Sequence, residues 1–480
     1  MSKLLLCSAI ALNAFCAGGI FTFPLMSPVL ASRMLLSQPQ LTTIILGAMM
    51  SQYPFAIFIG SLIDRHGPAP SSLIAALLFA VGFGGFAFEI TSTPEDIAHA
   101  SRGSFYRLAL YFLLAGLGTV FAYCSCVLSS SVFFPNHIGF ASGSTMALFG
   151  LSPFICSVVA TRFFMDSSNG TLKIVSFTTF LAVVTLLVYT YGFLVLRRYT
   201  WPIREIEEQD SPSTNCHDQV QETTPLLPSE RTESQAAQSS EPSAFQLLRK
   251  LDFWLLFVFC FLILGACEMV ISNIGSIVLS LPPISVIRPI PNNLLTVASS
   301  NTAFQVQLIS IVNTFTRFFV GPLADFISPV SIRDLTGVVS FPRKHFISRF
   351  AFLSSAALIL ALTFLWASFL VQDQSQVWLL SLGTGLSYST VFTVLPSLIS
   401  SLWGIRHLGR NFGILMYAPF SGTPLFSYIY ALVSVANTVN GEGSCQGRKC
   451  WSTTFAIGIA TSSIALVFSF VLWKRWYSRI

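Results

Sequence analysis

Residues 252–281 read DFWLLFVFCFLILGACEMVISNIGSIVLSL, an apolar run whose interior holds a single charged residue, Glu268. About 20 apolar residues are enough for an α-helix to cross the hydrocarbon core of a bilayer. Runs of this length recur near residues 4–31, 40–63, 71–90, 106–130, 139–163, 173–196, 252–281, 302–324, 346–371, 376–401, 409–436 and 452–473. The sequence therefore predicts an all-α membrane protein with twelve transmembrane helices.

Composition supports the same class. Of 480 residues, 53% are hydrophobic and 10% are charged, whereas soluble domains average about 25% charged residues. The net charge of +6 comes from Lys and Arg residues that stand singly or in pairs at the ends of apolar runs. That placement sets membrane topology and does not favour a nucleic-acid partner. The first run, after Lys3, is expected to stay as a helix in the lipid.

The twelve runs divide into two sets of six. Between them, residues 198–250 are rich in Glu, Gln, Ser, Thr and Pro and are expected to form a disordered linker. The predicted units are therefore an N-terminal six-helix bundle, residues 1–197, and a C-terminal one, residues 251–480. With the linker and both termini in the cytosol, 17 Lys and Arg residues face the cytosol and eight the other side, as the positive-inside rule requires.

Two motifs recur between the halves. Residues 60–67 read GSLIDRHG after the second run, and residues 321–325 read GPLAD after the eighth, 261 positions later. Residues 137–143 read HIGFASG and residues 407–413 read HLGRNFG, 270 positions apart. Small residues one turn apart permit close helix approach, and repeated halves are typical of secondary transporters.

The first motif resembles the signature loop between the second and third helices of the major facilitator superfamily. The resemblance implies two pseudo-symmetric six-helix bundles and a gate at the inner ends of the helices. It assigns gating to Gly60, Asp64, Arg65 and Gly67, with Gly321 and Asp325 as counterparts in the second half. The alternative for this loop is a plain polar turn whose acid favours a helix end.

Residues 251–256, 268–277 and 409–413 resemble the fungal monocarboxylate-transporter homologues, vacuolar-type carriers of the same superfamily. This resemblance implies a multi-pass protein of the vacuole membrane, with the plasma membrane as the alternative. Monocarboxylate carriers have an Asp four residues before the Arg of the eighth helix. Here that position is Asn313, before Arg317, and this departure argues against proton-coupled monocarboxylate transport.

Charges inside the spans point to the substrate site. Glu268 lies midway in the seventh run and Arg317 lies within the eighth. A charge at the bilayer centre costs about 2.5–3.5 kcal/mol on lenient scales, so it faces a partner or an aqueous cavity. We hypothesise a patch of Glu268, Asn273, Asn313 and Arg317, in which Glu268 approaches Arg317, Arg317 binds an anionic substrate and Glu268 carries any coupled proton. The alternatives are a purely structural ion pair or an Arg317 that snorkels to the interface.

Cysteine placement predicts one disulfide and no metal site. Most cysteines lie in apolar runs without metal-ligand spacing. Cys445 and Cys450 lie in the non-cytosolic loop before the last run, where oxidation is permitted. Asn169-Gly170-Thr171 is a glycosylation sequon on the same side, close to the membrane.

The linker carries a candidate sorting signal. Glu222 precedes Leu226 and Leu227 in a pattern that resembles the acidic dileucine signal. An exposed acid and two leucines on a disordered tether suit capture by a cytosolic sorting adaptor. This signal favours the vacuole membrane over the plasma membrane.

The residues predict a carrier and not an enzyme. The chain has no Walker loop, His-Glu-x-x-His or Gly-x-Ser-x-Gly motif, and no cofactor is expected. We expect a monomeric secondary active transporter that moves a small organic solute, an anion if Arg317 binds it, by alternating access. The alternative is a transporter-like sensor that signals through the linker.

Overall fold

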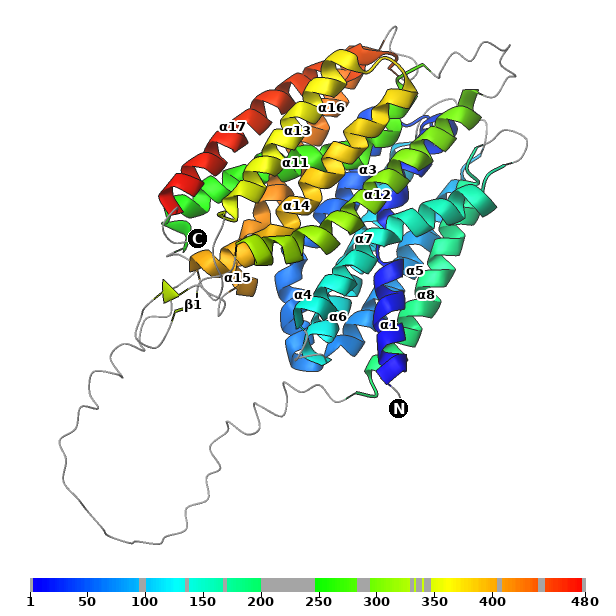
Figure 1. Cartoon of the computed structure of the whole chain (residues 1–480). Helices are drawn as coiled ribbons and strands as arrows, with labels where there is room; N and C mark the ends of the chain where they lie inside the picture. Colours follow the sequence, from blue (N-terminus) through cyan, green and yellow to red (C-terminus); the bar gives the residue numbers. More distant parts are fainter. Residues whose placement is uncertain are drawn as a thin grey trace, which may run out of the picture.

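The helices form one bundle in a computed structural model of the chain (Figure 1). Among the described residues, ten stretches are long and apolar enough to cross a bilayer. The second and eleventh expected spans each consist of two helices, and neither is among these ten. The structure describes residues 3–94, 101–133, 138–166, 171–199, 247–282, 294–328, 332–333, 339–340, 347–403, 408–438 and 445–476. The predicted twelve-helix fold is confirmed.

The first half supplies spans one to six. Its helices are α1 (Lys3–Cys16), the 3-10 turn η1 (Gly19–Thr22), α2 (Phe23–Arg33), α3 (Gln38–Met50), α4 (Gln52–His66), α5 (Pro68–Ser92), α6 (Arg102–Phe133), α7 (Ile138–Phe163) and α8 (Ile174–Leu196). The first span thus consists of α1, η1 and α2, and the second of α3 and α4.

The second half supplies spans seven to twelve. Its elements are α11 (Leu251–Leu279), α12 (Leu294–Ile327), β1 (Ile332–Arg333), β2 (Val339–Ser340), α13 (Phe350–Leu370), η4 (Gln374–Val377), α14 (Trp378–Trp403), α15 (Leu408–Leu415), α16 (Tyr417–Ala436), η7 (Arg448–Cys450) and α17 (Ser452–Trp476). The two short strands form an antiparallel pair between α12 and α13. Both chain ends lie at the same end of the bundle, here the termini end; the opposite end is the far end (Figure 1).

Proline explains both divided spans. A proline inside a helix cannot bond to the carbonyl four residues earlier. For Pro54 that carbonyl belongs to Met50, the last residue of α3, and for Pro419 it belongs to Leu415, the last residue of α15. Helix α16 packs against both α3 and α4. The two kinked spans therefore meet where the halves face each other.

Each half has its own buried core. In the first half Phe79 stacks on Phe83 and Tyr189, with ring centroids 5.6 Å and 5.2 Å away. In the second half Phe364 stacks on Phe455 at 5.2 Å. Separate cores let each half move as a unit.

The halves touch most closely toward the far end. A Cβ added at Gly275 of α11 would collide with the carbonyl oxygen of Pro24 in α2. The hydroxyls of Thr43 in α3 and Tyr428 in α16 lie 2.8 Å apart. Toward the termini end, by contrast, a Cβ added at Gly60 or Gly143 would meet no atom of the described residues within 4 Å. Within the described part of the chain, the close helix approach expected from the 137–143 motif is not seen at Gly143.

Within the second half, α11 and α16 make a contact that tolerates no side chain. A Cβ at Gly265 would lie 2.7 Å from the carbonyl carbon of Gly422. We predict that Gly265→Ala lowers the free energy of unfolding by about 1–3 kcal/mol, the usual cost of overpacking, and so lowers the midpoint of thermal unfolding in detergent. Gly143→Ala is the matched control and should leave the midpoint unchanged. Equal midpoints for the two variants would contradict this packing.

Candidate functional site

Glu268 lies in a cage of three hydroxyl groups. Its side chain has no exposed surface. Tyr53 and Tyr388 donate to Oε1, the latter at 3.3 Å, and Thr423 donates to Oε2 at 2.6 Å. The donors come from α4, α14 and α16, so Tyr53 belongs to the first half and the others to the second. The carboxylate thus accepts hydrogen bonds from both halves.

Local packing explains why these groups converge. Glu268 lies three residues after Gly265, on the same face of α11. Since Gly265 and Gly422 bring the two helix backbones together, Thr423 reaches the carboxylate from the neighbouring helix. Tyr53 is two residues beyond the break at Ser51. The kink of the second span therefore lies directly beside the cage.

Arg317 lies on the wall of a cavity between the halves. The cavity is lined by residues of both halves: Phe21, Met49, Phe149, Gly150, Pro153, Ile271, Val306, Ile309, Ser310, Asn313, Arg317 and Tyr388. Arg317 Nε is buried without a hydrogen-bond partner. No ion pair or hydrogen bond joins Arg317 to any residue that the structure describes. Its position on this wall favours an inward-facing guanidinium over one that snorkels.

The hypothesised pair of Glu268 and Arg317 does not form. Among the described residues, the ion pairs are Arg107 with Glu89 and Arg475 with Asp252. Glu268 is instead satisfied by hydroxyls, and Tyr388 both donates to Glu268 and lines the cavity with Arg317. Tyr388 therefore connects the hydroxyl cage of Glu268 with the cavity wall on which Arg317 lies.

Asn313 and Asn273 lie in different parts of the structure. Asn313 lines the cavity one turn before Arg317, and its Oδ1 accepts a 2.5 Å bond from Ser389. Asn273 does not line the cavity: its Oδ1 accepts bonds from Gln38 at 3.1 Å and Thr42 at 3.2 Å. It ties α11 to α3 toward the far end. The four residues therefore do not form the single patch expected from the sequence. Glu268 lies in the hydroxyl cage, Asn313 and Arg317 line the cavity wall, and Asn273 bridges the two halves.

Comparisons with known proteins identify the family of the chain. Residues 6–427 match the family model described as Major Facilitator Superfamily. The chain belongs to the major facilitator superfamily. It is 26% identical to "Probable transporter mch1" of Emericella nidulans, over 96% of this chain and 84% of that protein. It is 25% identical to "Probable transporter MCH1" of Saccharomyces cerevisiae, over 96% of this chain and 90% of that one.

Solved structures of this superfamily show the same fold. The inward-open xylose transporter XylE from E. coli superposes with a TM-score of 0.59 at 12% identity, over 98% of this chain and 95% of that one. The nucleoside transporter NupG superposes with a TM-score of 0.62 at 13% identity, over 98% and 99%. The superfamily consists of transporters and not enzymes, as the sequence predicts. The resemblance to the fungal homologues is also confirmed.

The motif at residues 60–67 forms the last two turns of α4 and the glycine that follows them. Gly67 adopts φ 78°, a left-handed conformation that favours glycine, and it ends α4 directly before Pro68 begins α5. Arg65 is exposed, whereas the side chain of Asp64 lies outside the described part. The gating roles of Gly60, Asp64, Arg65 and Gly67 stay predictions.

In the second half, Gly321 makes only ordinary contact: a Cβ there would lie 3.5 Å from Thr393 Cγ2. The side chain of Asp325 is not described. Arg349, at the start of α13, is 1% exposed and donates Nε to the carbonyl of Ser328 at 2.9 Å. A cation is favourable at this C-terminal end of α12. Arg349 is therefore a buried cation that links the end of α12 to the start of α13.

Tyr53, Tyr388 and Thr423 were not expected to bind Glu268. Tyrosine and threonine are common in helix bundles, where each makes one local hydrogen bond. Tyr53 is 215 positions from Glu268 and Thr423 is 155 positions away. No pattern in the sequence indicates which residues of different halves are in contact. The cage could therefore be found only in the structure.

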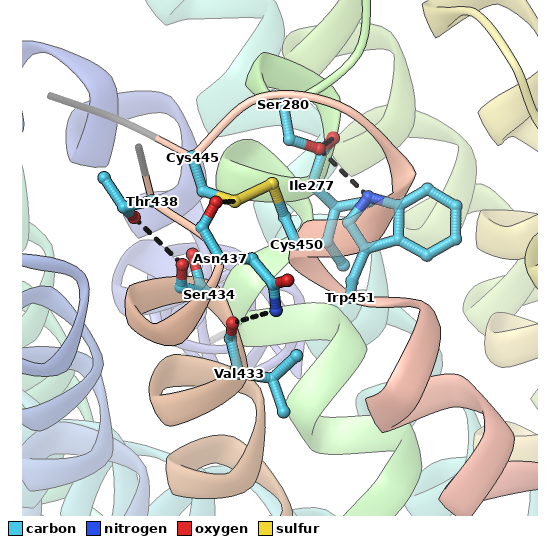
Figure 2. Close-up of a disulfide and its surroundings, with 9 residues drawn as sticks. All are labelled: Ile277, Ser280, Val433, Ser434, Asn437, Thr438, Cys445, Cys450 and Trp451. Carbon is cyan, nitrogen blue, oxygen red and sulfur yellow. Dashed lines mark hydrogen bonds between the residues drawn. A yellow bond between two sulfur atoms is a disulfide. The ribbon is translucent and has the colours of Figure 1, made fainter. Parts of the chain in front are cut away.

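A disulfide joins Cys445 to Cys450 at the far end (Figure 2). The loop that it closes packs on the end of α11. There Trp451 Nε1 donates to Ser280 Oγ at 3.0 Å, and the amide of Gly447 donates to the Ser280 carbonyl at 2.6 Å. The disulfide therefore holds the loop that covers the C-terminus of α11.

Other expected sites lie outside the described residues. These are the sequon at Asn169 and the sorting signal of Glu222, Leu226 and Leu227. The described residues contain no group of three or more His, Cys, Asp or Glu side chains that could hold a metal ion.

We predict that the double variant Cys445→Ser, Cys450→Ser unfolds at a lower temperature than the wild type. For so short a loop the chain-entropy model gives roughly 2 kcal/mol of stabilisation. Reducing agent should lower the midpoint of the wild type to that of the variant and leave the variant unchanged. Cys7→Ser, at an exposed free thiol, is the control. A wild type insensitive to reducing agent would contradict the prediction.

Proposed function

We propose that the protein is a secondary active transporter of a small organic anion, which it moves by alternating access of the cavity between its halves. One observation carries the proposal: Arg317 lies on the wall of that cavity with no counter-ion among the described residues. A cation inside a membrane protein is costly unless it meets an anion or water. The substrate would supply the negative charge.

The lining of the cavity supports a solute that has both a polar and an apolar part. Phe21, Met49 and Ile271 give an apolar wall, while Arg317 and Asn313 give the polar end. A guanidinium binds a carboxylate through two parallel hydrogen bonds. A small carboxylate with an apolar body fits these features.

The contacts between the halves support alternating access. Toward the far end, Asn273, Gln38 and Thr42 hold the halves together. Gly60 and Gly143, nearer the termini end, have no close neighbour among the residues that the structure describes. Glycines at these positions allow neighbouring helices to pack closely when the termini end closes. We infer that the present conformation is closed at the far end and that the termini end closes in the other state.

We propose the vacuole membrane as the location, with both termini in the cytosol and the chain acting as a monomer. The bias of Lys and Arg, 17 against eight, supports this orientation. The dileucine pattern and the resemblance to vacuolar-type carriers support the location. The plasma membrane is the alternative.

Arg317→Gln tests the anion site. Wild type and variant are reconstituted in liposomes and given a panel of labelled mono- and dicarboxylates and uncharged solutes. A hydrogen bond to a charged group contributes about 1.5–3 kcal/mol, so we predict a ten- to hundredfold rise in apparent KM for the transported anion. Arg162→Gln, at an exposed arginine of α7, should behave as wild type.

Two results would count against the proposal. Equal anion uptake by Arg317→Gln and wild type would remove Arg317 from the site. Saturable binding of an anion without flux would favour the solute sensor.

Substitution of Leu226 and Leu227 by Ala tests the sorting signal. In a fungal cell we predict that a fluorescent fusion of this variant accumulates at the plasma membrane, because the adaptor no longer captures the linker. Substitution of Ser229 and Ser234 by Ala, elsewhere in the linker, is the control. Unchanged vacuolar targeting of the dileucine variant would remove the linker from the sorting argument.

A further inference from the structure

We propose that Glu268 is the proton-binding group of this carrier, and that the hydrogen bond from Tyr53 is a latch that couples its protonation to the arrangement of the halves. The proposal rests on the proposed transport function, because it names the coupled ion. Glu268 has no exposed surface and accepts bonds from Tyr53, Tyr388 and Thr423.

The cage stabilises a carboxylate without a cation. A buried charge must be paired or hydrogen-bonded. Among the described residues no Lys or Arg pairs with Glu268, and its three donors are neutral hydroxyls. Hydroxyl donors and a bound proton are thus the two means by which this site can be satisfied.

The neighbourhood of Glu268 holds few other titratable groups. Tyr53 faces it from α4 and Tyr388 from α14, and Arg317 of α12 lies beyond Tyr388 on the cavity wall. Cys267 precedes it in α11. Helix α16 contributes Thr423, which does not titrate, and no described side chain of α2, α3 or α17 bonds to it.

A metal cation fits the cage poorly. A hard cation such as sodium or calcium binds through the lone pairs of several oxygens. At Glu268 these lone pairs accept hydrogen bonds from the three hydroxyls, with Thr423 at 2.6 Å. A proton needs only one lone pair, so the geometry favours a proton.

Protonation changes the bond to the first half. A hydronium ion that reaches Glu268 gives a proton to one carboxylate oxygen and leaves as water. The new O–H bond turns that oxygen from acceptor into donor and removes the negative charge. Hydrogen bonds to a charged acceptor are roughly twice as strong as neutral ones. The bond from Tyr53 therefore weakens, and α4 is released close to its break at Ser51.

The same arrangement links the proton to the substrate. Tyr388 contacts Glu268 and lines the cavity beside Arg317. An anion bound at Arg317 adds a second negative charge near the carboxylate of Glu268, and protonation of Glu268 removes the repulsion between the two. Anion and proton binding therefore favour each other.

The titration can be observed without a known substrate. The full chain in lipid nanodiscs is examined by infrared difference spectroscopy between alkaline and acidic buffer. We expect the carbonyl stretch of a protonated carboxylic acid to rise on acidification in the wild type and in Tyr53→Phe, and to be missing in Glu268→Gln. Replacing sodium in the buffer by choline should leave the band unchanged.

The latch is measured by spin labels on His66→Cys and Lys250→Cys, which are exposed positions near the termini end of the two halves, with Cys7 and Cys216 replaced by Ser. We expect acid to shift the distance distribution of the wild type. Tyr53→Phe should show the shifted distribution already at neutral pH, as should Glu268→Gln. Tyr430→Phe removes the hydroxyl of a different buried tyrosine, which lies in α16, and should match the wild type.

Three outcomes would overturn the proposal: no band that depends on Glu268, a band that requires sodium, or a Tyr53→Phe variant whose distances match the wild type at neutral pH. These outcomes are separate from a failure of transport. A carrier without proton coupling still moves labelled solute in the liposome panel. A chain that moves no solute but titrates as expected would keep the proton latch and lose the transport function.

Discussion

The carboxylate of Glu268 must find all its partners inside the protein, and much of the central structure follows from this requirement. A charged group in the apolar centre of a bundle costs several kcal/mol unless its neighbours compensate it. Here the compensation comes from Tyr53, Tyr388 and Thr423. Since one of the three belongs to the other half, the cost of burying the charge depends on how the two halves are arranged.

Two further features of the structure lie next to Glu268. The contact of Gly265 with Gly422 brings α16 close enough for Thr423 to reach the carboxylate. The break of the second span at Ser51 lies two residues from Tyr53. Helix contact, kink and charge thus form one unit beside the cavity of Arg317. Through this unit, a change in charge in the cavity can affect α4 and α16, the helices that carry Tyr53 and Thr423.

The sequence predicts the fold well and the site in part. Apolar runs report membrane spans directly, because only helices of sufficient length satisfy their backbone in lipid, and all twelve were found. The charged residues Glu268 and Arg317 stand out for the same reason. Their partners do not, since Tyr53 and Thr423 are ordinary helix residues whose importance depends on contacts between spans. For the same reason Asn273, expected in the cavity, lies in a bridge to α3.

Alternating access, as proposed, requires the halves to separate toward the far end, where Thr43 and Tyr428 now meet. The most direct measurement is uptake of the transported anion after Thr43→Cys and Tyr428→Cys are joined by a short, cleavable thiol crosslinker in reconstituted vesicles. We predict that uptake stops on crosslinking and returns on cleavage, while the two single variants treated alike keep their uptake. Undiminished uptake by fully crosslinked protein would contradict the claim.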